Sequence, residues 1–176
     1  MEIARTAFED VFLIALRPLK DERGSFARVF SADTFRDHGL CTSYPEHSAA
    51  CNLKRGILRG LHYQVAPYGE IKVIRCTFGR IFDVLVDIRP TSSTFGQWLS
   101  FELDAENPQM LYVPAGIAHG YQTLSDISHI EYLISEPYHA ESVSGIKWDS
   151  AELAIRWPIA DPILSERDRS HPLFAR

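Results

Sequence analysis

The stretch Arg55–Gln64, RGILRGLHYQ, is the segment around which we predict the rest of the fold to be organised. Its alternating side chains and flanking glycine are typical of a β-strand, in which neighbouring residues point to opposite faces. A regular strand would therefore place Arg59 on one face and His62 on the other. A buried arginine requires an anion or a carboxylate, and a histidine is the side chain best suited to moving protons near neutral pH. Taken alone, the stretch fits a functional pair and also a plain ion pair beside a hydrogen-bonded core histidine.

Short segments with strand character recur along the chain on both sides of this stretch, separated by turns that contain glycine and proline. This pattern predicts an all-β fold, an antiparallel sandwich or closed barrel, in a single domain over residues 1–176. A short helix is expected from a cap at Ser31 or Asp33 to a stop at Gly39. The sequence shows neither βα alternation nor a glycine-rich phosphate loop, which argues against a dinucleotide-binding fold. The expected strands, with an irregular segment at 41–47, cover residues 11–16, 26–30, 71–77, 80–88, 96–103, 110–113, 118–124 and 128–135.

Composition and charge argue against several classes of function. The net charge of -5 argues against general nucleic-acid binding, and no apolar run approaches the length of a membrane span. The three cysteines, Cys41, Cys51 and Cys76, have no paired spacing, so we expect reduced thiols and a cytoplasmic protein. Although the chain has seven histidines, it contains no His-x-His pair, and neither His62 nor His119 has a carboxylate at the usual close spacing. We therefore expect no metal site.

Polar side chains in apolar segments mark further candidate positions. Lys72 and Asp83 lie on consecutive strands that a hairpin would bring side by side, and Asp83 stands in an apolar run where a carboxylate needs a partner. This pair is either structural or orients a histidine or lysine over a substrate. His119 begins a strand beside a glycine, which leaves open space for a ligand. Tyr132 fits a core position or an acid, and Tyr138 is a loop aromatic that could stack on a flat ligand.

Taken together, these segments resemble the dTDP-4-dehydrorhamnose 3,5-epimerases, nucleotide-sugar epimerases whose fold is a cupin-like jelly roll with a few short helices. The matching stretches follow the order of the family over nearly the whole chain, which makes the set far more specific than any single motif. They are DERG at 21–24 with Phe26, GILRGLHYQ at 56–64, FDV at 82–84, DIR at 87–89, STFG at 93–96, AEN at 105–107, VP at 113–114, HG at 119–120, GIKWD at 145–149, WP at 157–158 and LSERD at 164–168.

The resemblance implies a reaction that needs no metal or redox cofactor, the epimerisation of a nucleotide-linked 4-keto-6-deoxyhexose at C3 and C5. The ketone at C4 acidifies the hydrogens on both neighbouring carbons, so a base can remove one and an acid can return another from the opposite face. By this resemblance, His62 is the base and Asp168 fixes its tautomer. Lys72 stabilises the enolate oxygen, and Tyr132 is the opposing acid.

The resemblance also implies substrate-binding positions, with arginines suited to the paired oxygens of the diphosphate. Some positions depart from the family pattern. Arg28 replaces a glutamate, and His47 and Ala49 fall where Gln-x-Asn is usual, unless a one-residue shift places Glu46 and Ser48 there. We therefore keep GDP or CDP as alternative carriers and epimerisation at C3 only as an alternative reaction. The candidate substrate-binding residues are Arg23, Phe26, Arg28, His47, Arg59, Asp83, His119, Tyr138 and Arg167.

Two alternatives come from other functional classes: a non-catalytic jelly roll that binds a nucleotide sugar, and a metal-dependent cupin oxygenase or isomerase. The presence of His62, Asp168, Lys72 and Tyr132 weighs against the first. The expected partners are a nucleotide-sugar substrate and a second copy of the chain, in a homodimer that shares its N-terminal strands. Neither nucleic acid nor a membrane is expected as a partner.

Overall fold

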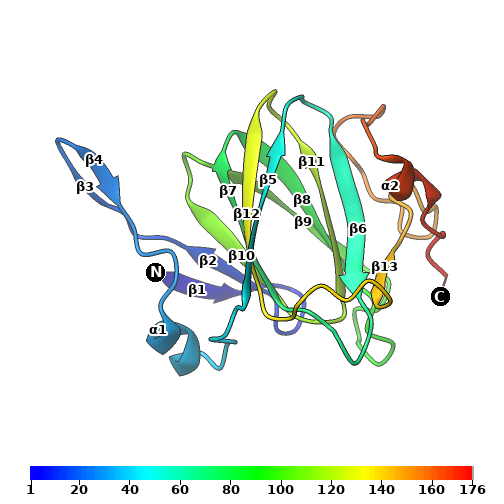
Figure 1. Ribbon diagram of the computed structural model, residues 1–176, viewed down its shortest axis with the longest axis horizontal. Coiled ribbons are helices and arrows are strands. Elements are labelled where there is room, and N and C mark those ends of the chain that lie inside the picture. The colour runs from blue at the N-terminus through cyan, green and yellow to red at the C-terminus, as the bar shows by residue number, and fades with distance from the viewer. Residues whose placement is uncertain (176) are drawn as a thin grey trace.

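Within residues 1–175, which the computed structural model describes, the chain forms two antiparallel β-sheets packed face to face (Figure 1). The first sheet has the strand order β1-β2-β10-β7-β12-β5, the second has the order β13-β6-β11-β8-β9, and β3 and β4 form a separate hairpin. No helix among these residues is long and apolar enough to cross a membrane. The elements are β1 Glu2–Arg5, β2 Phe12–Ala15, β3 Leu19–Asp21, β4 Gly24–Phe26, α1 Ala32–Asp37, β5 Glu46–Asn52, β6 Leu58–Gln64, β7 Lys72–Phe78, β8 Arg80–Asp87, β9 Trp98–Asp104, β10 Gln109–Val113, β11 Ile117–Thr123, β12 Ser128–Ile134, β13 Val143–Gly145 and α2 Glu166–Ser170.

The structure confirms the predicted all-β fold and the helix capped by Ser31, whose hydroxyl accepts a hydrogen bond from the Thr34 amide. The strand predicted over 26–30 is wrong, because strand structure ends at Phe26 in the β3–β4 hairpin. Strands β1, β3, β5 and β13 have no counterpart among the predicted strands, and β3 covers residues that the sequence indicated as a turn. β5 is an edge strand whose mostly exposed residues lack a clear apolar alternation, and β13 is three residues long.

Strands β7 and β8 follow each other in the chain but lie in different sheets. The hairpin expected between them is therefore wrong, because the turn at Gly79 passes the chain from one sheet to the other. Lys72 and Asp83 consequently approach each other across the interior, close enough for the lysine to act on the titration of the carboxyl. Their closeness is a product of sheet packing and not of strand pairing.

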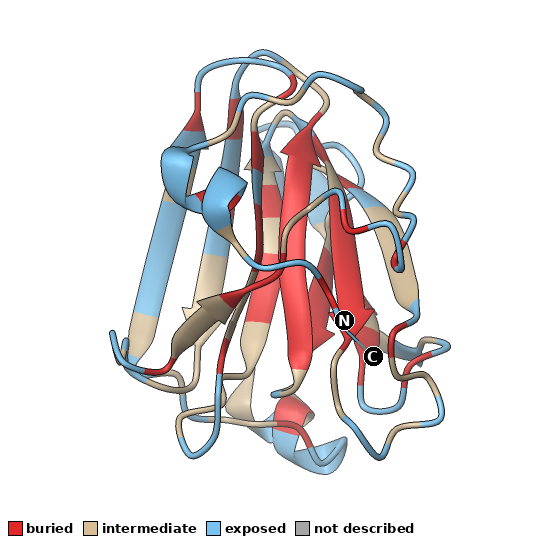
Figure 2. Ribbon diagram, turned by 90° about the vertical axis from the view of Figure 1, so that its right-hand side faces the viewer, coloured by how far each residue is buried: buried red, intermediate tan, exposed pale blue. Residues whose placement is uncertain are grey.

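Apolar side chains fill the space between the sheets and also cover both outer faces. Ile74 and Leu85 belong to the core between the sheets. Phe35 of α1 packs on the outer face of the first sheet, and Phe174 of the C-terminal segment packs on the outer face of the second. The central strands are accordingly buried on both sides (Figure 2). Because β11 is buried along its whole length, any polar side chain on it must find its partner inside the protein.

Strands β6 and β11 pair with one extra residue on β6. His62 pairs with His119 and Arg59 pairs with Tyr121, so three steps along β6 match two steps along β11. Such a β-bulge shifts the alternation of the strand by one residue. Arg59 and His62 therefore line the same cavity between the sheets, and the expectation that they lie on opposite faces is wrong.

The bulge depends on the close approach of two glycines. Gly60 has a φ of +132°, and a Cβ atom there would lie 2.5 Å from the Cα of Gly120. A Cβ atom on Gly120 would in turn lie 2.8 Å from the carbonyl oxygen of Arg59. A side chain at either position would push the two strands apart, so both glycines are required for packing.

Gly60→Ala should lower the free energy of unfolding by about 2–5 kcal/mol, because backbone strain of about 1–3 kcal/mol adds to a steric clash with Gly120. Gly24→Ala is the matched control. Gly24 has a similar φ of +128°, but nothing lies within 4 Å of the added Cβ, so only the strain remains. Urea unfolding of both variants measures the difference. Equal losses would show that the contact between the strands does not hold the bulge.

Candidate active site

A cavity of about 310 Å³ lies between the sheets, where β6 and β11 of the second sheet face β7 and β12 of the first. Both sheets contribute charged and aromatic side chains to its wall, beside an apolar core. The residues that line the cavity are Ser48, Arg59, His62, Tyr63, Gln64, Glu70, Lys72, His119, Tyr121, Tyr132, Ile134, Tyr138, Val143 and Arg167.

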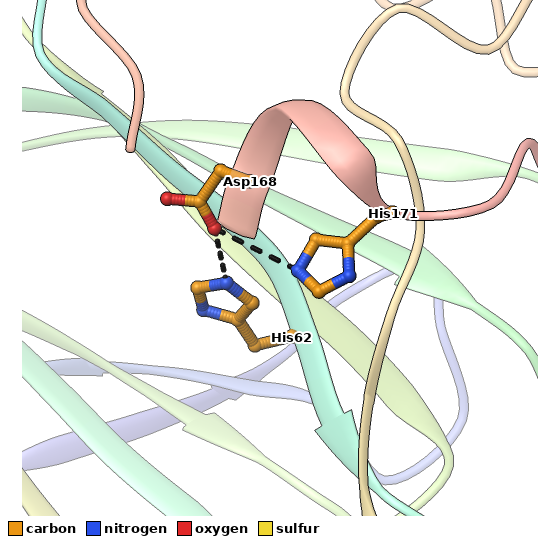
Figure 3. Close-up of side chains that lie close together, drawn as sticks. All are labelled: His62, Asp168 and His171. Carbon is orange, nitrogen blue, oxygen red and sulfur yellow. Dashed lines mark hydrogen bonds and ion pairs between the residues drawn. The ribbon is translucent and has the colours of Figure 1, made fainter. Parts of the chain in front are cut away.

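His62 is bound to a carboxylate from a distant part of the chain. Its Nε2 lies 2.5 Å from Oδ1 of Asp168, and its Nδ1 points away from that carboxylate (Figure 3). Burial raises the pKa of Asp168, but the hydrogen bonds from His62 and from the Ser165 hydroxyl outweigh burial and hold the pKa below its usual value. An ionised carboxylate accepts the hydrogen of Nε2, so the lone pair of the neutral imidazole is on Nδ1.

Backbone pairing and a helix cap carry Asp168 to β6. The amide of Leu58 donates to the carbonyl of Ile163, whose own amide donates to the carbonyl of Gly56. Two residues later Ser165 caps α2, and its hydroxyl oxygen accepts a hydrogen bond from the Asp168 amide. Serine followed three residues later by an acid is the sequence signal of such a cap, and it is the local signal that could have predicted α2.

A second histidine–carboxylate pair lies behind the cavity wall. Nε2 of His119 lies 2.8 Å from Oδ2 of Asp83, and both side chains are almost wholly buried. The other carboxylate oxygen, Oδ1, has no hydrogen-bond partner within residues 1–175. Burial raises the pKa of Asp83, and the opposing effects of His119 and Lys72 do not offset it. The ionised carboxyl therefore lowers the stability of the fold, as is common for groups placed for chemistry.

Two tyrosines, one from each sheet, face the cavity: Tyr132 on β12 and Tyr121 on β11. The ring of His119 neighbours both, with its centroid 6.1 Å from that of Tyr132 and 6.2 Å from that of Tyr121. Burial raises the pKa of Tyr132 well above its usual value, and the neighbouring Tyr121 and Asp83 raise it further. The phenol of Tyr132 therefore keeps its proton at neutral pH.

Two cations enter the cavity, each held by a neighbour. Nε of Arg59 donates to Oδ1 of Asn52 at 2.8 Å, which orients the guanidinium. Nζ of Lys72 lies 2.6 Å from a carboxylate oxygen of Glu70, and the two side chains are only 12% and 14% exposed. Oriented positive charge of this kind suits the oxygens of an anionic substrate.

Four of the predicted binding residues lie away from this cavity in the same chain. Arg23 and Phe26 are exposed on the β3–β4 hairpin, which projects from the body (Figure 1), and Arg28 follows it, also exposed. His47 lines a different cavity of about 510 Å³, on the outer face of the first sheet. Its neighbour Ser48 faces the cavity between the sheets, which favours the alignment shifted by one residue.

The other predicted residues line the cavity or bind a side chain that does. These are Arg59, His62, Lys72, Asp83, His119, Tyr132, Tyr138, Arg167 and Asp168. Sequence reasoning missed Tyr121, although strand alternation from His119 would have placed it on the same face. It also missed Asn52 and Glu70, because no local pattern distinguishes them from surface residues, whereas Ser48 was named only as the alternative to His47.

This arrangement can remove a proton from one side of a bound molecule and supply one from the other. His62 belongs to the second sheet and Tyr132 to the first, so they reach the cavity from opposite walls. The ammonium group of Lys72 lies in the same cavity, where it can stabilise negative charge that develops on a substrate oxygen. Such a set suits proton abstraction next to a carbonyl group.

Comparisons with known proteins agree with this chemistry. The family model described as dTDP-4-dehydrorhamnose 3,5-epimerase matches residues 5–176. The protein of that name from Escherichia coli (strain K12) is 42% identical over 172 residues, 96% of this chain and 91% of that protein. The crystal structure of the Bacillus anthracis protein with TDP and PPi bound has a TM-score of 0.96 and 38% identity, covering 98% of this chain and 99% of that chain. A Legionella pneumophila 3,5-epimerase in complex with dTDP-4-keto-L-rhamnose has a TM-score of 0.92 and 34% identity, covering 98% and 92% of the two chains.

The solved structures also confirm the fold class, since they match this chain over nearly its full length at TM-scores above 0.9. The fold is the cupin-like jelly roll that the family resemblance implies.

Asp83→Asn should change the pH dependence of stability in one direction. Because the pKa of Asp83 is higher in the folded protein than in the unfolded chain, the wild type loses stability as the pH rises from about 4 through the raised pKa. Asparagine does not titrate. The unfolding free energy of the variant minus that of the wild type should therefore increase between pH 4 and 7, as measured by urea unfolding.

Asp161→Asn is the control for this experiment, because Asp161 is an exposed carboxylate. Its curve gives the effect of removing a carboxylate that is not buried. A flat or falling curve for Asp83→Asn would contradict the raised pKa of the buried carboxyl.

Proposed function

The chain belongs to the dTDP-4-dehydrorhamnose 3,5-epimerase family and is an isomerase of that type, and we propose that the cavity between its sheets carries out the reaction on dTDP-4-dehydro-6-deoxyglucose. One observation supports this site above all others. The His62–Asp168 pair and the protonated phenol of Tyr132 face the same cavity from opposite sheets. Inverting a carbon requires this geometry, because the proton must leave one face and arrive on the other.

We propose that Nδ1 of His62 is the base. The sugar ketone at C4 acidifies the hydrogens at C3 and C5, and the lone pair on Nδ1 takes one of them as the electrons of the C–H bond move into the enolate. Asp168 stays ionised and stabilises the imidazolium that forms, because its Oδ1 accepts the hydrogen of Nε2. The pair therefore provides a base of fixed tautomer and fixed direction.

Tyr132 is the acid that returns a proton on the opposite face. Its raised pKa keeps the phenol protonated until a carbanion-like carbon lies next to it. Lys72 holds positive charge near the developing enolate oxygen. Arg59 binds the diphosphate, whose paired oxygens suit a guanidinium, and the hydrogen bond to Asn52 orients that guanidinium.

Substitution of the base and of the acid should give different isotope patterns when the substrate is incubated in D₂O. His62→Asn should lower deuterium incorporation at C3 and C5 by about 10²–10⁴-fold, because no base remains. Tyr132→Phe should lower product formation by a similar factor but retain more incorporation, since His62 can return deuterium to the face it deprotonated. Proton NMR and product analysis measure both quantities.

The matched control is His129→Asn, because His129 is an exposed histidine on β12 that does not line the cavity. If His62→Asn incorporated deuterium at the wild-type rate, His62 would not be the base. If Tyr132→Phe formed product at the wild-type rate, Tyr132 would not be the acid.

The β3–β4 hairpin suggests a homodimer in which each chain completes the site of the other, and we propose this assembly. The hairpin projects from the body and exposes Leu19 and Phe26, at 75% and 69% (Figure 1). Large apolar side chains on a free arm call for a covering surface. Arg23 pairs only with Asp21 of the same hairpin among the described residues, and its guanidinium suits a diphosphate. The hairpin would then bring Arg23 and Phe26 to the nucleotide bound by the second copy.

Complementation between two defective chains tests this assembly. If Arg23 acts in the partner's site, co-expressed Arg23→Ala and His62→Asn chains form heterodimers with one site that contains both wild-type residues. Activity should then rise well above that of either variant alone. If Arg23 acts within its own chain, every site carries a defect and the mixture stays as inactive as its components. Size-exclusion chromatography with light scattering verifies that dimers form in each sample.

A cytoplasmic location is part of this proposal. Cys41, Cys51 and Cys76 form no disulfide among the described residues, as is usual in a reducing compartment. A non-catalytic sugar-nucleotide-binding protein would bind the same substrate without exchanging its carbon-bound hydrogens, so the D₂O experiment also separates that alternative.

A further inference from the structure

Three side chains with metal-binding atoms meet beside the cavity, although the proposed reaction uses only two of them. His62, Asp168 and His171 each offer one donor atom, and these atoms all lie within 4.8 Å of one another (Figure 3). Both imidazoles approach the same carboxylate oxygen, Oδ1. Nε2 of His62 lies 2.5 Å from it, and Nε2 of His171 lies 3.7 Å from it.

The nitrogen of His171 that faces this cluster is buried without a partner. The side chain is 10% exposed, and Nε2 makes no hydrogen bond to any of residues 1–175. Its distance from Asp168 is too long for a hydrogen bond. A buried polar atom without a partner calls for a ligand.

The ring of His171 is held in this position. It lies against Gly145, where an added Cβ would come within 2.4 Å of the ring, and Gly145 pairs with His62 across the neighbouring strand. The carbonyl of Pro172 accepts a hydrogen bond from the Lys147 amide at 2.7 Å, which fixes the chain directly after the histidine. The two imidazole rings meet edge to face, with centroids 5.4 Å apart. The cluster is therefore organised before any ion arrives.

Two imidazoles and one carboxylate form a donor set that Zn²⁺ uses in proteins when a fourth position stays open. Zinc–ligand bonds of roughly 2.0 Å place tetrahedral donors roughly 3.3 Å apart. The 3.7 Å between His171 and Asp168 is close to that separation. Nε2 of His62 now lies 2.5 Å from Oδ1 of Asp168. It would have to move roughly 0.8 Å further from that oxygen to reach the separation of two zinc ligands. The side chain of His62 is 35% exposed, so neighbouring residues do not enclose it on every side.

We propose that His62, Asp168 and His171 form a zinc site that inhibits the enzyme. The neutral imidazole of His62 carries one proton, on Nε2, and its Nδ1 lone pair is the proposed base. An ion bound at Nε2 requires the lone pair there, so the proton moves to Nδ1, which can then no longer accept hydrogen from the sugar. Zinc should lower kcat more than it changes KM. The inhibition rests on the proposed function, whereas metal binding does not.

The direct test titrates metal-free, full-length protein with Zn²⁺ by calorimetry and with Co²⁺ by visible absorption. We expect one ion per chain and the absorption of a four-coordinate site. His171→Asn removes one ligand and should weaken binding by more than about tenfold. His129→Asn, which changes an exposed histidine on β12 of the other sheet, should bind as the wild type does. Lowering the pH below about 6 should weaken binding, because protons compete for the imidazoles.

The activity test measures zinc inhibition of each protein relative to its own metal-free rate. Zinc should inhibit the wild type and His129→Asn, and the concentration for half inhibition should rise more than about tenfold in His171→Asn. Unchanged Co²⁺ or Zn²⁺ affinity in His171→Asn would overturn the site. If that variant does not fold, as thermal unfolding would show, His62→Asn removes a different ligand and must weaken the Co²⁺ spectrum instead. A protein without epimerase activity that still binds Co²⁺ through His171 would contradict the proposed function and leave the metal site standing.

Discussion

The contact between Gly60 and Gly120 is the constraint on which the site depends. Two strands in the second sheet approach so closely at these glycines that no Cβ fits, and β6 takes one extra residue there. The extra residue moves Arg59 and His62 onto one face, where a regular strand would separate them. A cation and a base then share one cavity, while the residues around them keep an ordinary antiparallel ladder.

The two histidine–carboxylate pairs of the site link segments that are far apart in the sequence. Asp168 reaches His62 from the C-terminal segment, and His119 holds Asp83 from the neighbouring strand. The interior makes these pairs effective, because a hydrogen bond or charge in a dry environment acts more strongly than in water. The same dryness raises the cost of any atom left unpaired, as at Oδ1 of Asp83 and Nε2 of His171.

The family resemblance predicted the candidate site more completely than local patterns could. His62 stands inside the GILRGLHYQ stretch, and the order of the matching stretches assigns Lys72 as well, and both residues line the cavity. Glu70 and His171 lie outside any pattern of alternation or spacing, and only packing shows that they touch the site. The hairpin with Arg23 is exposed and lines no described cavity of its own chain, so packing within one chain assigns it no site.

The sequence by itself determined that the chain forms antiparallel strands, because alternation and turn residues are local properties that need no knowledge of distant contacts. It also carried the residue types for moving a proton beside a ketone. Only the tertiary structure decided that β7 and β8 separate into different sheets and that the bulge turns Arg59 toward His62. Sheet choice and register depend on which faces pack together, and that is settled by the whole core at once.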